Sequence, residues 1–114
     1  MAMQYKVVIV LALTLLISLA VSRTVSGEVP TAADFAACNE GAPQEVKAGT
    51  ASPTMGDHIR ADSARAGAVT RNYTGFARKV IESSDPQIHG MEAEGARDAT
   101  YQAVYRSCMR RKGF

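Results

Sequence analysis

An apolar run near the N-terminus divides this chain into two parts. The run, Val7 to Val21, is fifteen residues long, follows Lys6 and leads into small residues. A positive start, an apolar centre and a small-residue end are typical of a secretory signal peptide. We therefore expect residues 1–27, or alternatively 1–22, to be a cleavable signal helix. Residues 28–114 are then a small domain that folds in the periplasm or is secreted.

An uncleaved leader is the alternative. Fifteen apolar residues are fewer than the roughly 20 that span a bilayer as a helix. However, Arg23 could close the run as a flanking charge. The protein would then stay in the inner membrane, held by a single N-terminal anchor.

Beyond the leader, the chain is poor in the side chains that build a hydrophobic core. All five leucines lie before residue 20, and from residue 28 onward there are seventeen large apolar residues and sixteen alanines. Eleven of the thirteen basic residues and all eleven acidic residues also lie there, so the two signs balance. This balance does not favour a nucleic-acid partner. A domain so small and so poor in apolar residues is marginal without a cross-link.

Two cysteines can supply that cross-link. Cys38 and Cys108 are the only cysteines in the chain, and in an exported protein an even number predicts a disulfide. Closing a loop of about 70 residues stabilises a fold by roughly 4 kcal/mol in the chain-entropy model. That is comparable with the whole stability of a small domain. We therefore expect a structural disulfide, with reactive or metal-binding thiols as the alternative.

Helical patterns predict an all-α fold, a small bundle of about three helices. The first, about 31–40, opens with Thr31 and Asp34, which resemble a capping box. It is expected to end before Pro43, and residues 42–54 are expected to be a loop with partial disorder.

The second predicted helix is the longest, about 54–83. Apolar residues recur in it every seven positions, at Ile59, Ala66, Tyr73 and Val80. Gly67 and Gly75 weaken the pattern, so a kink or a division of this helix near residues 72–75 is the alternative. Pro86 follows its end, and residues 84–97 are expected to be loop with partial disorder, with a short helical turn at most over 87–97.

The third predicted helix, about 98–112, has the clearest pattern. Asp98 is a good N-cap. The buried stripe is predicted to contain Tyr101, Val104, Tyr105 and Cys108. A bridge from Cys108 to Cys38 would clamp the last helix to the first.

The two segments that carry the cysteines resemble a pattern known from other proteins. The chain closes with Tyr105-x-x-Cys108-Met109-x-x-Lys112-Gly113-Phe114, and Cys38 lies in a short helical segment after the leader. This resembles small exported bacterial envelope proteins with two cysteines, several of them of the glycine-zipper type. The Gly-x-x-x-Gly repeats of that type are absent here, so its membrane-inserting behaviour is not implied. The resemblance implies a bacterial envelope protein with paired cysteines and no assigned activity.

Candidate catalytic groups do not form a recognisable motif. Ser63 and Ser83 have no local signature of a nucleophile, and Glu92 and Glu94 would diverge on a helix. We therefore expect neither an enzyme nor a cofactor. An envelope metal-binding or redox protein is a minor alternative, because thioether and imidazole groups suit copper. The residues concerned are Met55, His58, His89 and Met91.

The basic end of the last helix is the best candidate contact surface. The cations there are Arg106, Arg110, Arg111 and Lys112. They could meet an anionic membrane surface or an acidic envelope protein. The alternative is a solvated helix end whose cations offset the helix dipole.

Overall fold

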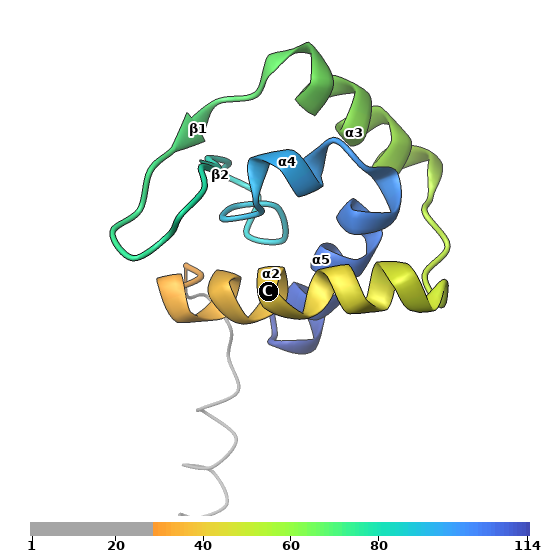
Figure 1. Ribbon diagram of the computed structural model, residues 1–114, viewed down its shortest axis with the longest axis horizontal. Coiled ribbons are helices and arrows are strands. Elements are labelled where there is room, and N and C mark those ends of the chain that lie inside the picture. Colours follow the sequence, from red (N-terminus) through yellow and green to blue (C-terminus); the bar gives the residue numbers. More distant parts are fainter. Residues whose placement is uncertain (1–28) are drawn as a thin grey trace, which may run out of the picture.

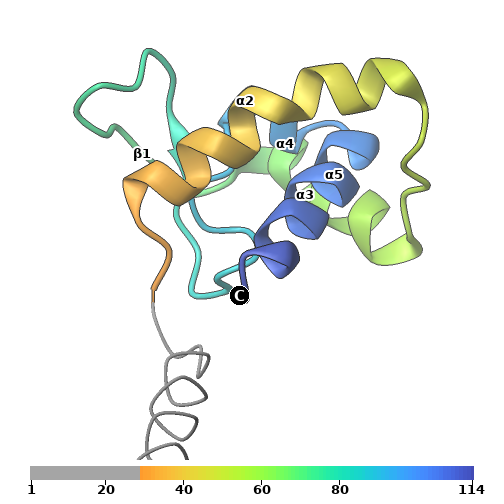
Figure 2. The same cartoon turned by 90° about the horizontal axis from the view of Figure 1, so that it is seen from below.

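The computed structural model describes residues 29–114, so the predicted signal peptide lies outside the described part. The elements are α2 (Ala32–Ala48), α3 (Met55–Gly67), β1 (Thr70–Arg71), β2 (Val80–Ile81), α4 (Ala93–Ala96) and α5 (Ala99–Arg111). The fold is mostly helical, which confirms the predicted class. α5 packs against both α2 and α3, and Figure 1 shows these two helices on opposite sides of the molecule. In the view of Figure 2, α2 runs along the top of the molecule and α5, which packs against it, lies below.

The first helix is longer than predicted. It starts at the expected capping box of Thr31 and Asp34 but continues through Pro43 to Ala48. Proline lacks the N–H that would reach the carbonyl of Asn39 four residues earlier. The hydroxyl of Tyr101 lies 3.5 Å from that carbonyl oxygen, but its single proton is donated to the closer Oδ1 of Asn39 at 2.8 Å. The helix is held instead by its buried side, where Cys38 and Ala42 are each 1% exposed. Tertiary packing therefore keeps a helix where the local signal predicted its end.

The second helix is shorter than predicted. It ends at Gly67, where a φ of 124° requires glycine, and Ala68 is already extended. Val80 and Ile81 then pair with Arg71 and Thr70 in a small antiparallel hairpin. The expected helix over 54–83 is therefore wrong beyond residue 67. The residues spaced seven apart belong in part to α3 and in part to the hairpin. They do not form one buried face, since Ile59 is 58% exposed.

The segment 84–97 is packed, contrary to the expectation of partial disorder. Ile81 exchanges backbone hydrogen bonds with Gly90 and Met91, at 2.9 and 2.7 Å. Met91 and Ala96 are completely buried. In the other expected loop, 42–54, only the part after Ala48 is non-helical. The segment 84–97 is thus ordered by single side chains buried in the core, such as Met91, although its apolar residues show no helical periodicity.

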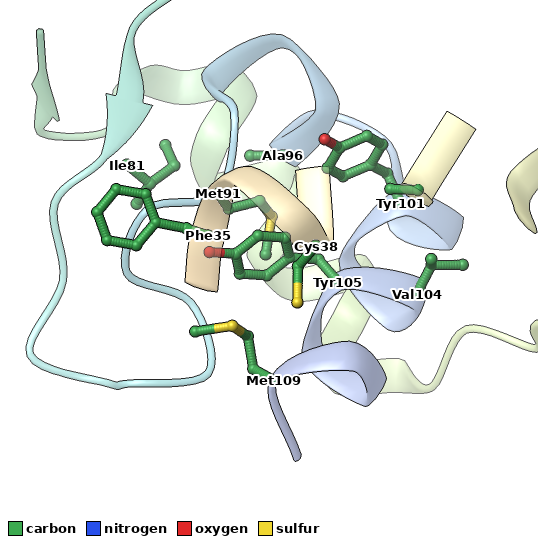
Figure 3. Packing of buried hydrophobic residues seen from close by; sticks show 10 residues of the cluster. Phe35, Cys38, Ile81, Met91, Ala96, Tyr101, Val104, Tyr105 and Met109 are labelled. Atoms are coloured by element: carbon green, nitrogen blue, oxygen red, sulfur yellow. The ribbon is translucent and has the colours of Figure 1, made fainter. Parts of the chain in front are cut away.

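The core is built around the predicted disulfide. Cys38 and Cys108 are bonded, with their Cα atoms 5.7 Å apart, so that part of the prediction is confirmed. Phe35, Tyr105 and Met109 are almost fully buried, and Figure 3 shows them gathered about Cys38. The last helix forms as predicted, since Asp98 accepts hydrogen bonds from the N–H groups of its first turn.

Candidate functional site

A buried asparagine joins three parts of the fold. Asn39 of α2 donates to the carbonyl of Gly90 at 2.8 Å and accepts from the N–H of Glu92 at 2.9 Å. Its Oδ1 also accepts from the hydroxyl of Tyr101 at 2.8 Å. Burial and, to a lesser extent, the nearby carboxylate of Glu92 raise the pKa of Tyr101, which favours the protonated hydroxyl that donates this bond. The network positions α4 and α5 relative to α2.

A buried carboxylate joins α3 to the basic end of α5. Asp57 is 1% exposed and accepts hydrogen bonds from Arg60 at 3.0 Å and from Arg106 at 2.8 Å. Its other oxygen accepts the backbone N–H of Thr54 at 2.8 Å. Burial raises the pKa of Asp57, but the hydrogen bonds from Thr54, Arg60 and Arg106 outweigh it and hold the pKa at about 2. Two guanidinium groups share one carboxylate, so the cluster keeps one net positive charge.

The four predicted cations do not form one surface. Arg106 and Arg110 line a hollow of about 180 Å³ beside Asp57, which we call the basic hollow. Arg111 and Lys112 instead lie near α2, where they approach Glu45 at 3.8 Å and Asp34 at 3.5 Å. Arg110 is exposed and makes no ion pair with any residue of 29–114.

The four residues considered for copper binding lie in different surroundings. Met91 is in the core, whereas Met55 and His58 are exposed on α3. His89 is held by the N–H of Ser83 on Nδ1 and by Tyr73 on Nε2, each at 3.2 Å. Within the described residues, no three or more histidine, cysteine, aspartate or glutamate side chains come together in a group that could hold a metal ion.

A second hollow was not predicted from the sequence. This apolar hollow, about 180 Å³, lies between α3, β2, α4 and α5, and its walls include Ala64, Ile81, Ile88 and Ala96. Arg60 and the buried Gln102 also line it. These residues come from four separate elements and from the segment between β2 and α4, and no local motif connects them. Only their proximity in the fold identifies the site.

The outer side of α3 carries exposed apolar residues. Met55 is 75% exposed and Ile59 58%, and they lie one helical turn apart. Ala66 lies within about 40° of both around the helix. Val69, just beyond the end of α3, is 69% exposed. We call Met55, Ile59 and Ala66 the α3 outer face.

The disulfide is of the kind that forms and persists in oxidising, non-cytosolic compartments. None of the helices between residues 29 and 114 is long and apolar enough to cross a membrane. No protein-family model, curated protein or solved structure significantly matches this chain.

Proposed function

We propose that residues 28–114 form an exported, non-catalytic interaction module of the bacterial cell envelope. The signal-peptide pattern and the disulfide support export to the periplasm. The observation that carries the interaction role is the α3 outer face. After residue 27 this chain has only seventeen large apolar side chains, yet Met55 and Ile59 are exposed on the same helix side. In so small a core, such residues would stabilise the fold more if they were buried.

A neutral, apolar protein surface is the partner that suits this face. Asp62 lies on the same side of α3 but pairs with Arg65 at 2.6 Å, so neighbouring charges are balanced. An anionic lipid surface would need an excess of cations. Aromatic and aliphatic anchors that fill a partner's pocket carry most of the energy of such contacts.

Site-specific photo-crosslinking in intact cells tests this role. A photoreactive residue at Met55 should give a discrete adduct, because this position lies inside the contact. The same residue at Gln44, which is exposed on α2, should give none. Ile59→Asp should abolish the Met55 adduct, whereas Gln44→Asp should leave it intact. An adduct that persists in Ile59→Asp would contradict the proposed face, and an adduct of twice the module's mass would identify a second copy as partner.

Export is tested by the intact mass of protein recovered from cell envelopes. We expect a mass matching residues 28–114 or 23–114, with thiol alkylation only after reduction. A full-length mass would instead support the N-terminally anchored form. Carbonate extraction then gives an independent answer, because an anchored protein remains in the membrane pellet.

The basic hollow supports a second candidate function, contact with an anionic membrane. Arg110 is the cation there that the described residues leave unpaired. Flotation with vesicles containing anionic lipid should then recover the protein, with less recovery for Arg110→Gln. Equal recovery with uncharged vesicles would contradict this function.

A further inference from the structure

Met55 differs in exposure from the other two methionines of the described residues. It is 75% exposed on α3, whereas Met91 and Met109 are fully buried in the core. Both cysteines of the chain are bonded to each other, and the chain has no tryptophan. Among the side chains of residues 29–114, thioethers are therefore the groups that a mild two-electron oxidant attacks first, and that of Met55 is the one within its reach.

The position of Met55 separates its chemistry from the stability of the fold. It is the first residue of α3, and the start of this helix is held by the capping box of Thr54 and Asp57. The hydroxyl of Thr54 accepts from the N–H of Asp57 at 3.2 Å, and the carboxylate of Asp57 accepts from the N–H of Thr54 at 2.8 Å. Neither bond involves the thioether, so a polar group added at the sulfur would meet water and leave the helix intact.

The same position makes the α3 outer face sensitive to polarity. Met55 and Ile59 are the two large side chains of this face, one helical turn apart. Methionine sulfoxide carries a strong hydrogen-bond acceptor, which an apolar partner surface would leave unmet. Burying an unmet acceptor in such a contact weakens binding about tenfold or more.

We propose that Met55 is an oxidation site, and that its conversion to methionine sulfoxide releases the partner from the α3 outer face. The oxidant is a peroxide. Its O–O bond breaks, one oxygen forms an S–O bond with the thioether, and with hydrogen peroxide the remainder leaves as water. Sulfur loses two electrons and the peroxide gains them. A bound partner shields Met55, so the oxidant acts on the free protein. The release rests on the proposed contact, whereas the oxidation depends only on exposure.

Intact mass and peptide mapping test the modification itself. Protein recovered from cell envelopes, with its disulfide intact, is treated with hydrogen peroxide. One oxygen should be added at Met55 at least about tenfold faster than at Met91 or Met109, because the core must open before those two react. The urea midpoint of the singly oxidised protein should equal that of the untreated protein. Equal rates at the three methionines, or a lowered midpoint, would overturn this part.

Photo-crosslinking from position 66 tests the release. A photoreactive residue in place of Ala66 lies on the α3 outer face and leaves Met55 available for oxidation. The untreated protein, added to isolated envelopes, should give a discrete adduct, and the singly oxidised protein about a tenth of that yield. Met55→Leu keeps an apolar side chain without a thioether, so its adduct should survive peroxide treatment. Combining Met55→Leu with Gln44→Met moves the exposed thioether to α2, where its oxidation should leave the adduct unchanged.

The release and the contact fail in different ways. No adduct from the untreated protein would contradict the contact and the release together, while the mass data still decide the oxidation site. An equal yield before and after oxidation of Met55 would overturn the release and leave the contact standing. Loss of the adduct after oxidation of the Gln44→Met control would also overturn the release, because the effect would then not depend on Met55.

Discussion

Removing the side chain of Asn39 should destabilise the fold strongly. Asn39→Ala removes the side-chain partner of the Gly90 carbonyl, the Glu92 N–H and the Tyr101 hydroxyl, and leaves only the backbone carbonyl of residue 39, at 3.5 Å, near that hydroxyl. At about 1 kcal/mol each, the low end for a buried unmet group, the loss is about 3 kcal/mol. Domains of this size are stable by only about 5–15 kcal/mol, so the change is large.

Urea unfolding of the oxidised protein, followed by far-UV circular dichroism, measures this loss. Tyr101→Phe removes only one of the three hydrogen bonds to Oδ1 and Nδ2 of Asn39 and should cost about 1 kcal/mol. Gln44→Ala, on the exposed side of α2, should change the free energy of unfolding by less than about 0.5 kcal/mol. The reasoning is refuted if Asn39→Ala is no more destabilising than Tyr101→Phe, because the asparagine would then not act as a shared hub.

Three further perturbations test other parts of the structure. Replacing Cys38 and Cys108 together by alanine should lower the free energy of unfolding by about 4 kcal/mol, measured by urea titration, because the 70-residue loop is no longer closed; an unchanged midpoint would argue against this. The pKa of Asp57 is lowered from 3.8 to about 2 on folding, so its stabilisation is complete above pH 3.8 and is lost as the pH falls towards 2. Asp57→Asn should therefore flatten the dependence of the urea midpoint on pH in that window, and an equally steep dependence would exclude Asp57 as its source. Gly90→Ala should lower the melting temperature sharply, because φ is 86° there and the added Cβ would collide with the ring of Phe35; calorimetry showing parent-like melting would contradict that close approach.

The helix starts that depend on hydrogen bonds within a single turn could be predicted from the sequence. The capping box at Thr31 and the N-cap at Asp98 gave two correct helix starts. The buried face of α5 could also be predicted, because its apolar stripe is continuous and is followed by basic residues and a glycine. Periodicity failed between residues 68 and 83, where Val80 is buried by pairing in a hairpin and not by a helix face. An apolar spacing alone cannot distinguish these two origins of burial.

The candidate sites were only partly accessible to the sequence. The sequence shows that four cations lie near the end of α5, but not that Arg106 faces α3 while Lys112 faces α2. Asp57 of α3 causes this separation, because its carboxylate binds Arg106 of α5, 49 positions away in the sequence. The apolar hollow gave no signal at all, since Arg60 and Gln102 belong to different helices.

The sequence by itself determined the helical class, the pairing of Cys38 with Cys108 and the faces of α5. These follow from residue counts and from hydrogen bonds within a few positions, which do not depend on the rest of the fold. Tertiary structure alone decided that α2 passes through Pro43, that the chain after Gly67 returns as a hairpin, and that the segment before α4 is packed. In each case a distant side chain or strand satisfies buried polar or apolar groups, and its free energy exceeds the local preference.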